Sequence, residues 1–239
     1  MVHGLSGAPE STAPLKPDLK FFRSEHPSVM TLYDYLDSGN GYKIRLLLAQ
    51  LKRLYRYVEL DIMRGETHTP LFLAKNPNGR IPTLELEDGR CLAESDAILW
   101  YLADGTGFVP SDSYARAQVL QWMFFEQYSH EPYIAVARFW LAFVPEEKRR
   151  EKILLLPEWH ARGNAALDVM EGHLKTRDWF VANKFTLADI ALYAYTHCAA
   201  DGGFNLSKYP RVQGWLKRIE NVKGYVPMPP APLSGNSKS

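Results

Sequence analysis

The chain has 239 residues, which is enough for one large domain or two smaller ones. Its composition, with 46% hydrophobic and 23% charged residues, is that of a globular protein rather than a disordered one. The formal net charge of +1 gives no reason to expect nucleic acid or an anionic membrane as a partner. No apolar run reaches the roughly 18 residues that a membrane span requires.

The two cysteines, Cys91 and Cys198, lie far apart and form no CxxC pair. This argues against a disulfide framework and against a redox pair of protein thiols, and it favours the reducing cytoplasm. We expect both cysteines to be buried packing residues. We predict no metal ligands.

The two ends of the chain differ in composition from its middle. Residues 1–29 are rich in Ser, Pro, Gly and Lys and lack the apolar stretch of a signal peptide, so we expect a flexible N-terminal extension. The closing stretch PMPPAPLSGNSKS, residues 227–239, predicts a disordered tail.

The first structured segment reads as a strand, a helix and a second strand. TLYDYL (Thr31–Leu36) alternates and is β-prone, and Tyr42–Lys52 carries its apolar residues on one helical face. YRYVELD (Tyr55–Asp61) is the second strand. This order predicts two parallel strands joined by a right-handed crossover.

The chain then continues through a short helix at Thr69–Lys75 and a turn at NPNG. PTLELED and RCLA, separated by Asp88-Gly89, predict a hairpin. SDAILWYLAD predicts a helix with Ser95 as its N-cap. The order βαβαββα predicts an α/β domain over residues 30–104, with a small mixed sheet and helices packed on it.

Residues 105–113, GTGFVPSDS, form a linker by composition. After it the sequence shows helical patterns and no strand pattern. A long helical stretch runs from Tyr114 to about Phe143 and is disturbed at Pro132, and a second one contains Pro157. Phe185–Cys198 is strongly apolar and predicts a buried helix. We therefore expect an all-α domain over residues 114–226.

The first candidate for chemistry is SGNG (Ser38–Gly41), between the first strand and its helix. A helix N-terminus has unpaired N–H groups and about half a positive charge, so it suits an anion. A hydroxyl from Ser38 or an amide from Asn40 would donate to a thiolate or carboxylate there. Lys43 and Arg45 have the wrong sign for the helix dipole, which hints at an anionic ligand. The alternative is a plain helix cap, with both basic side chains in solvent.

Two further joints carry similar groups. In NPNGRIPTLEL, Pro82 opens a strand and Arg80 precedes it; a cis Pro82 would turn the backbone of Ile81 outward to pair with a peptide-like ligand. In LAESDAILWYL, Glu94 suits an ammonium and Ser95 a carboxylate. Each joint alone is explained by an ordinary turn or cap. Together, at one edge of the sheet, they predict a ligand with an ammonium, a carboxylate and an extended backbone, such as a tripeptide thiol.

These motifs resemble those of the cytosolic glutathione transferases. NPNGRIPTLE followed by AESDAILWYLA is specific for that superfamily, and FTLADIALYAY resembles its buried folding motif, in which Thr186 and Asp189 cap a core helix. SGNGYKI is similar to the nu-class pattern Thr/Ser-x-Asn-Gly-x-Lys and to the serine-type classes. The resemblance covers about Thr31 to Tyr225. It implies a thioredoxin-like N-terminal domain, a helical C-terminal domain and a homodimer.

The resemblance also implies roles for single residues. Ile81, before a cis Pro82, would pair with the cysteinyl unit of glutathione, Glu94 and Ser95 would hold its γ-glutamyl end, and Arg80 would lie near its glycine carboxylate. Asn40 or Ser38 would point at the sulfur and favour its thiolate form. The turn lacks the tyrosine of the alpha, mu and pi classes and the cysteine of the omega and beta classes.

The second substrate is expected on the first long helix of the helical domain. The aromatic and charged residues considered there are Trp122, Phe125, Tyr128, His130, Tyr133, Arg138 and Trp140, with Phe125, Tyr128, Tyr133 and Arg138 as the predicted pocket. Aromatic residues at helical spacing usually belong to the core, so we expect at least half of the five aromatic residues to be packing residues. His130 and Arg138 could reach the site, although a single His or Arg on a helix more often faces solvent or caps a neighbour. The sequence leaves three functions open. They are conjugation of glutathione to a hydrophobic electrophile, glutathione-dependent reduction of a disulfide or peroxide, and a non-catalytic glutathione-binding scaffold.

Overall fold

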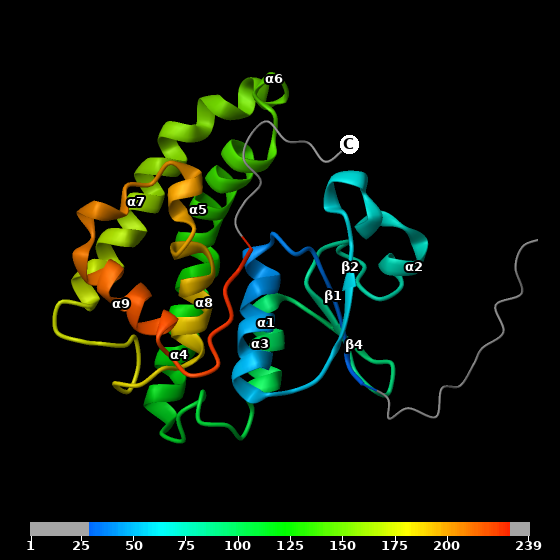
Figure 1. Ribbon diagram of the computed structural model, residues 1–239, viewed down its shortest axis with the longest axis horizontal. Coiled ribbons are helices and arrows are strands. Elements are labelled where there is room, and N and C mark those ends of the chain that lie inside the picture. The colour runs from blue at the N-terminus through cyan, green and yellow to red at the C-terminus, as the bar shows by residue number, and fades with distance from the viewer. Residues whose placement is uncertain (1–28, 230–239) are drawn as a thin grey trace, which may run out of the picture.

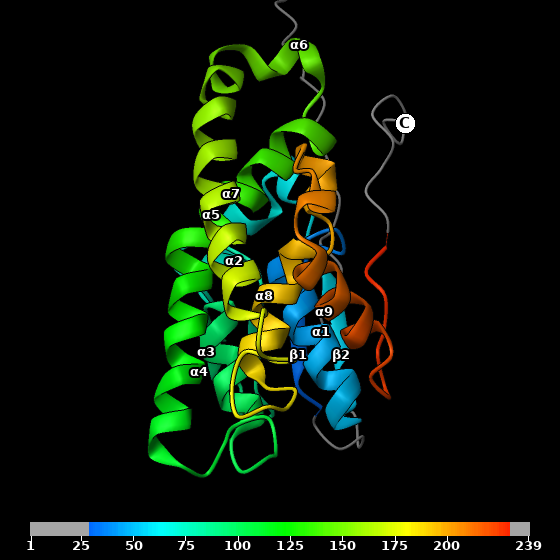
Figure 2. The same cartoon turned by 90° about the vertical axis from the view of Figure 1, so that its left-hand side faces the viewer.

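The computed structural model describes residues 29–229. The N-terminal extension expected over residues 1–29 lies outside the described part except for its last residue, as does the tail from residue 230. Figure 1 shows two parts side by side: a small sheet with its helices, and a bundle of helices. Helix α1 lies between them, alongside α8 of the bundle (Figures 1 and 2).

The N-terminal part begins with the expected strand, helix and strand. They are β1 (Thr31–Asp34), α1 (Gly39–Leu51) and β2 (Arg56–Glu59). β1 and β2 pair in parallel, with Thr31 opposite Arg56. β1 ends two residues earlier than its alternating pattern predicted, because the chain turns at 35–38 to enter α1.

The rest of the sheet is antiparallel. Short turns at Ile62–Arg64 (η1) and Glu66–His68 (η2) lead to α2 (Pro70–Leu73). Then come the hairpin strands β3 (Thr83–Glu85) and β4 (Cys91–Ala93). The strand order is β2-β1-β3-β4, which confirms the mixed sheet.

Helix α3 (Ser95–Ala103) closes this part, and α4 (Ser113–Phe125) opens the helical one. Two wide π-helical turns, η3 (Glu126–His130) and η4 (Phe139–Phe143), flank α5 (Glu131–Arg138). Pro132 in the first turn of α5 lacks an N–H and its ring would clash with the carbonyl four residues earlier. An uninterrupted α-helix is excluded there, as the sequence predicted.

The remaining helices pack around a buried centre. They are α6 (Glu146–Arg149), η5 (Arg150–Leu155), α7 (Leu156–His173), α8 (Leu187–Thr196), η6 (Ala199–Gly202), η7 (Leu206–Lys208) and α9 (Pro210–Glu220). The sequence predicts Pro157 inside a helix, but it lies in the first turn of α7, where no N–H is required. None of the helices in residues 29–229 is long and apolar enough to cross a membrane.

Helix α8 is buried along its whole length and carries the predicted capping motif. Thr186 and Asp189 form a reciprocal capping box at its start. The Asp189 carboxylate also accepts from the indole N–H of Trp215 at 3.0 Å and from the backbone N–H of Phe180 at 3.2 Å. The motif therefore ties α8 to α9 and to the loop before it.

The chain after α9 runs back across α1. The Tyr42 hydroxyl donates to the carbonyl of Val226 at 2.7 Å, and the Tyr193 and Tyr225 hydroxyls lie 2.9 Å apart. Met228 is 9% exposed and belongs to the core. The packed part of the chain therefore extends beyond residue 226, where the tail was expected to begin.

Candidate functional site

The strand register brings the three predicted joints to one edge of the sheet. Thr83 of β3 pairs with Tyr33 of β1 on one side and with Ala93 of β4 on the other. Because β3 is antiparallel to both, it starts where they end. The segments carrying Ser38, Pro82 and Glu94 therefore leave the sheet together.

More of the N–H groups at the amino end of α1 are hydrogen-bonded than the sequence suggested. Ser38 is the N-cap, and its Oγ accepts from the N–H of Gly41 at 3.3 Å. The N–H of Asn40 donates to the Tyr195 hydroxyl at 3.3 Å, and that of Tyr42 to the Ser38 carbonyl at 2.9 Å. The expectation of unpaired N–H groups is therefore wrong for Asn40 and Gly41, whereas the N–H of Gly39 has no partner among residues 29–229. The side-chain donors left for a ligand are the Ser38 hydroxyl proton and the amide of Asn40.

Tyr195 reaches this end of α1 from the helical domain. A Cβ on Gly39 would lie 2.6 Å from its ring, so the close approach requires glycine at this position. The sequence lacks a tyrosine in the turn itself, and the fold brings one in from α8. No local pattern points to it, because 155 residues separate Tyr195 from Asn40.

The Asn40 side chain is held at both ends. Its Oδ1 accepts from the Ser95 hydroxyl at 3.3 Å, and its Nδ2 donates to Glu131 Oε1 at 3.2 Å. Two predicted site residues from different joints are thus in direct contact. Glu131 was not predicted. It enters from α5, across the boundary between the two parts of the chain.

Lys43 does not face solvent. Its side chain is fully buried, and Nζ lies 2.7 Å from Glu126 Oε2 and 3.3 Å from both Asp96 Oδ1 and Ser95 Oγ. Burial opposes its charge, but the attraction of the two carboxyls outweighs burial and raises the pKa of the ammonium. Burial also raises the pKa of Glu126 to about 8, because the attraction of Lys43 offsets burial only in part and the charge of Asp96 adds to it.

Arg45 is also internal. Its Nε lies 3.2 Å from Asp34 Oδ2, and its Nη2 donates to the Leu36 carbonyl at 2.6 Å. Arg138 of α5 donates to the next carbonyl, that of Asp37, at 2.9 Å. The loop before Ser38 is therefore fixed by two arginines, one from each part of the chain.

The residues predicted to recognise a peptide-like ligand line the same edge. The Ile81–Pro82 bond is cis, as the resemblance implied, with Pro82 buried and Ile81 half-buried. Arg80 is exposed and forms no ion pair with any residue from 29 to 229. Glu94 is exposed at φ +66°, outside the favoured regions for a non-glycine residue. Such backbone costs about 1–3 kcal/mol and is common at ligand clamps.

No hydrogen bond, aromatic contact or cation–π contact in the described part of the chain joins the four predicted pocket residues to one another. Tyr128 is 83% exposed, Phe125 packs edge-on against Trp122, and Tyr133 lies under the guanidinium of Arg162. Only Arg138 touches the loop before Ser38. It is buried and also bonded to Asp201 at 3.1 Å, so it has a structural role there.

Phe143 is the aromatic residue beside Arg138, with 4.8 Å between the guanidinium carbon and the ring centre. Sequence periodicity does not find it because it lies five residues after Arg138. In an α-helix of 3.6 residues per turn such residues point about 140° apart. The π-helical turn η4 places them together instead.

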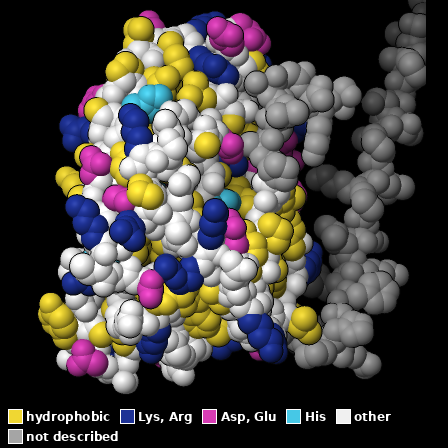
Figure 3. All heavy atoms as spheres, turned by 60° about the vertical axis from the view of Figure 1, so that its left-hand side comes forward, with side chains coloured by type: hydrophobic (Ala, Val, Ile, Leu, Met, Phe, Trp, Pro, Cys, Tyr) yellow, Lys and Arg dark blue, Asp and Glu magenta, His cyan; other side chains and the backbone are white. Residues whose placement is uncertain are grey.

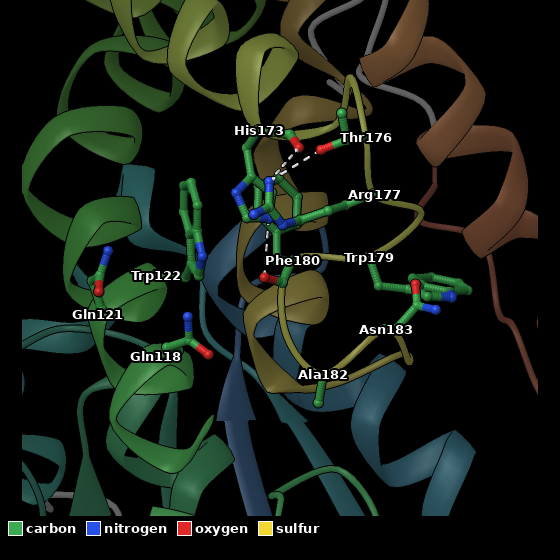
Figure 4. A pocket seen from close by; sticks show the side chains of 10 residues that line it. All are labelled: Gln118, Gln121, Trp122, His173, Thr176, Arg177, Trp179, Phe180, Ala182 and Asn183. Carbon is green, nitrogen blue, oxygen red and sulfur yellow. Dashed lines mark hydrogen bonds between the residues drawn. The ribbon is translucent and has the colours of Figure 1, made fainter. Parts of the chain in front are cut away.

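Two cavities lie in the part of the chain that the structure describes, and neither is lined by a predicted catalytic or glutathione-binding residue. Figure 4 shows one of about 400 Å³, lined by Gln118, Gln121 and Trp122 of α4 and by residues 173–183. The other, of about 540 Å³, lies between α3 and α4. Within residues 29–229, no three His, Cys, Asp or Glu side chains form a group that could hold a metal ion. Both cysteines are free thiols, and each is partly rather than fully buried.

Comparison with known proteins identifies the family. The family model for the glutathione S-transferase N-terminal domain matches residues 28–104, and that for the C-terminal domain matches residues 133–222. The crystal structure of a glutathione S-transferase from Pseudomonas fluorescens is 54% identical, with a TM-score of 0.80, over 84% of this chain and 99% of that one.

More distant relatives carry other names. The disulfide-bond oxidoreductase YfcG of Escherichia coli is 28% identical over 194 residues, which are 78% of this chain and 88% of that protein. Protein URE2 of Kluyveromyces marxianus is 27% identical over 84% of this chain, and the match spans only 59% of that protein. A structure of Ure2p in complex with glutathione is 26% identical, with a TM-score of 0.75, over 85% of this chain and 95% of that one. With both family domains present and a 54% identical transferase matched along nearly its whole length, the chain belongs to the cytosolic glutathione transferase superfamily.

Proposed function

We propose that this protein is a cytoplasmic glutathione transferase that activates the glutathione thiol for attack on an electrophilic small molecule. The observation that carries the proposal is the contact between Asn40 and Ser95, which joins the thiol-activating turn to the predicted γ-glutamyl site. The same edge of the sheet bears the cis Ile81–Pro82 bond and the strained backbone of Glu94.

The assigned roles match glutathione group by group. Glu94 is exposed and suits the γ-glutamyl ammonium, and Ser95 at the start of α3 suits its carboxylate. The backbone of Ile81 would pair with the cysteinyl unit, and the guanidinium of Arg80 would approach the glycine carboxylate. This arrangement directs the sulfur toward Ser38 and Asn40.

Thiol activation then depends mainly on side-chain donors. A free thiol has a pKa of about 8.5, and lowering it by two requires about 2.7 kcal/mol. A hydrogen bond to a charged group contributes about 1.5–3 kcal/mol, and a helix dipole about 0.3–1 kcal/mol. Several N–H groups of α1 are already paired, so Asn40 and Ser38 would supply most of the effect. The thiolate attacks an electrophilic carbon, and the leaving group departs with its electron pair.

Reduction of a disulfide is the second candidate, supported by the likeness to the oxidoreductase YfcG. Gly39, Asn40 and Gly41 occupy the turn, so no protein thiol is available there. The glutathione thiolate would attack the disulfide directly, releasing one thiolate and forming a mixed disulfide. A second glutathione would then release the other thiol and leave glutathione disulfide.

Asn40→Ala and Ser38→Ala test the assignment, with rates measured on an aryl halide and on hydroxyethyl disulfide. We expect Asn40→Ala to lower kcat/KM by about tenfold to a hundredfold, because a hydrogen bond to a charged sulfur is lost. Asn221→Ala, at the far end of α9, is the control. If Asn40→Ala and Ser38→Ala both keep wild-type rates, the assignment of thiol activation to these two residues is wrong. Retention on immobilised glutathione without turnover of either substrate would indicate the scaffold instead.

We further propose that the protein is a homodimer that pairs through the apolar cavity between α3 and α4. This cavity is lined by Leu92, Asp96, Ala97, Trp100, Tyr101, Asp104, Leu120, Met123 and Phe124. Tyr101 is 48% exposed and Phe124 is 68% exposed. Contiguous apolar surface of this kind marks interaction sites.

A further inference from the structure

We propose that Glu131, a residue of the helical domain, is a positioning residue that orients the Asn40 amide toward the glutathione sulfur, and that the π-helical turn Glu126–His130 holds it in place. The inference rests on the proposed function of Asn40. It assigns the helical domain a part in thiol activation, in addition to binding the second substrate.

The chemistry of the Asn40 contacts fixes which end of the amide faces which partner. A carboxylate only accepts hydrogen bonds, so Glu131 Oε1 selects the Nδ2 end of the amide at 3.2 Å. The Ser95 hydroxyl donates to the Oδ1 end at 3.3 Å. One Nδ2 hydrogen remains for a ligand. An amide rotated by half a turn would present its oxygen to the sulfur and repel the thiolate.

The π-helical turn explains how Glu131 reaches α1. The N–H of Glu131 bonds to the carbonyl of Glu126, five residues earlier. In an α-helix these two side chains would point about 140° apart, whereas a turn closed over five residues aligns them. Both carboxyls therefore face α1, where Asn40 and Lys43 are three residues apart on one face.

The second carboxyl anchors the turn. Glu126 lies 2.7 Å from Lys43, and neither side chain has any exposed surface. Lys43 in turn lies 3.3 Å from the Ser95 hydroxyl that holds the other end of Asn40. The contacts form a closed ring from Asn40 through Glu131, Glu126, Lys43 and Ser95 back to Asn40. Each member limits the freedom of the next.

An orienting role and a simple charge effect predict opposite results. A negative carboxyl near the sulfur would by itself raise the pKa of the glutathione thiol. If charge alone mattered, Glu131→Gln and Glu131→Met would both lower that pKa. If Glu131 orients Asn40, Glu131→Gln keeps an acceptor and preserves activation, whereas Glu131→Met keeps the volume, loses the acceptor and weakens activation.

The experiment measures the pKa of bound glutathione by thiolate absorbance, together with kcat and KM, in both variants. We expect Glu131→Met to raise the thiol pKa by about one and to lower kcat about tenfold with KM little changed, as loss of one such hydrogen bond predicts. Glu131→Gln should stay within about twofold of wild type on the same grounds. Glu147→Met, on an exposed position of α6, is the matched control. Equal effects of the two Glu131 variants would overturn the inference.

A double-mutant cycle separates this inference from the proposed function. In the Asn40→Ala background, Glu131→Met should have no further effect on the thiol pKa, because the residue through which it acts is gone. An undiminished effect there would show that Glu131 acts by another route and would overturn the inference alone. An Asn40→Ala variant with wild-type thiol pKa would overturn the proposed role of Asn40, and this inference with it.

Discussion

His130 ends the π-helical turn and is fully buried. Its Nε2 lies 2.8 Å from the Thr196 hydroxyl, which donates to the Leu192 carbonyl, so His130 is the donor to Thr196. Its Nδ1 has no partner in residues 29–229. Burial lowers the pKa of His130 to about 3, so the ring stays neutral in the folded protein. Its hydrogen bond is to Thr196 of α8 and not to a predicted glutathione-binding residue, so we assign it to stability.

The neutral state of His130 predicts a specific pH dependence. Between about pH 6.5 and pH 3 the unfolded chain binds a proton at this histidine and the folded chain does not, so the free energy of unfolding falls as the pH falls. One such group contributes about 1.4 kcal/mol per pH unit within this window. Denaturant unfolding of wild type and His130→Gln at pH 6.5, 5.5 and 4.5 measures the difference. The Gln side chain keeps a donor for Thr196, and the free energy of unfolding of His130→Gln should fall less steeply with falling pH than that of wild type. If the two proteins lose stability in parallel, His130 is not the group responsible.

The surroundings of Lys43 and Arg45 could not be predicted from the sequence. Their charges oppose the helix dipole, and this signal alone indicates either a ligand or a pair of solvent-facing side chains. Both residues instead pair with carboxyls inside the protein. The main partner of Lys43, Glu126, lies 83 residues along the chain. No local sequence pattern includes Glu126. The sequence therefore shows that Lys43 is unfavourably placed for the helix dipole, but not which carboxyl balances its charge.

The helices and strands of the N-terminal part could be predicted because their patterns are local. Alternation, apolar periodicity and the Asp88-Gly89 turn are properties of short segments, and the structure confirms the mixed sheet they implied. The π-helical turns could not be predicted in the same way. A search at 3.6 residues per turn treats residues five apart as unrelated, and it therefore separates Glu126 from Glu131 and Arg138 from Phe143. Pro132 predicted that the helix is interrupted, but it did not predict that the interruption is a π-helical turn.

Gly41 offers a test of the element that carries the site. It lies in the first turn of α1, and a Cβ there would come within 1.6 Å of Asp34 Oδ1. The Asp34 side chain is buried and paired with Arg45, so it has no free space into which to move. Gly214, in the middle of α9, is the matched control, because a Cβ added there would meet no neighbouring side chain within 4 Å.

We expect opposite changes in stability at these two glycines. Gly214→Ala should raise the free energy of unfolding by about 1 kcal/mol, because alanine favours a helix. Gly41→Ala should lower it by about 3 kcal/mol, because overpacking outweighs the same helical preference. Urea denaturation of both variants at pH 7 measures the changes. A stabilised Gly41→Ala would show that α1 and β1 are less closely packed than described.

At the scale of the whole molecule, both parts of the chain contribute residues to the candidate site. Asn40 receives a partner from each, the loop before Ser38 is bound by an arginine from each, and the segment after α9 crosses α1. Basic and acidic side chains are interspersed over the face shown in Figure 3. The apolar cavity between α3 and α4 differs from such mixed surface, and α3 carries Ser95 at its start. Dimerisation there would fix α3 and, through it, one end of the site.

Phe124→Asp tests the proposed dimer directly. Phe124 is 68% exposed at the cavity, and a charge placed in a buried apolar interface carries a large desolvation cost. We expect sedimentation to show wild type as a dimer and Phe124→Asp as a monomer at micromolar concentration. Leu154→Asp, at a side chain 75% exposed near α6, should remain dimeric. A monomeric wild type, or a dimeric Phe124→Asp, would mean that this face serves some other purpose. If α3 is steadied by the partner, the monomeric variant should also bind glutathione more weakly, since Ser95 then lies on an unsupported helix.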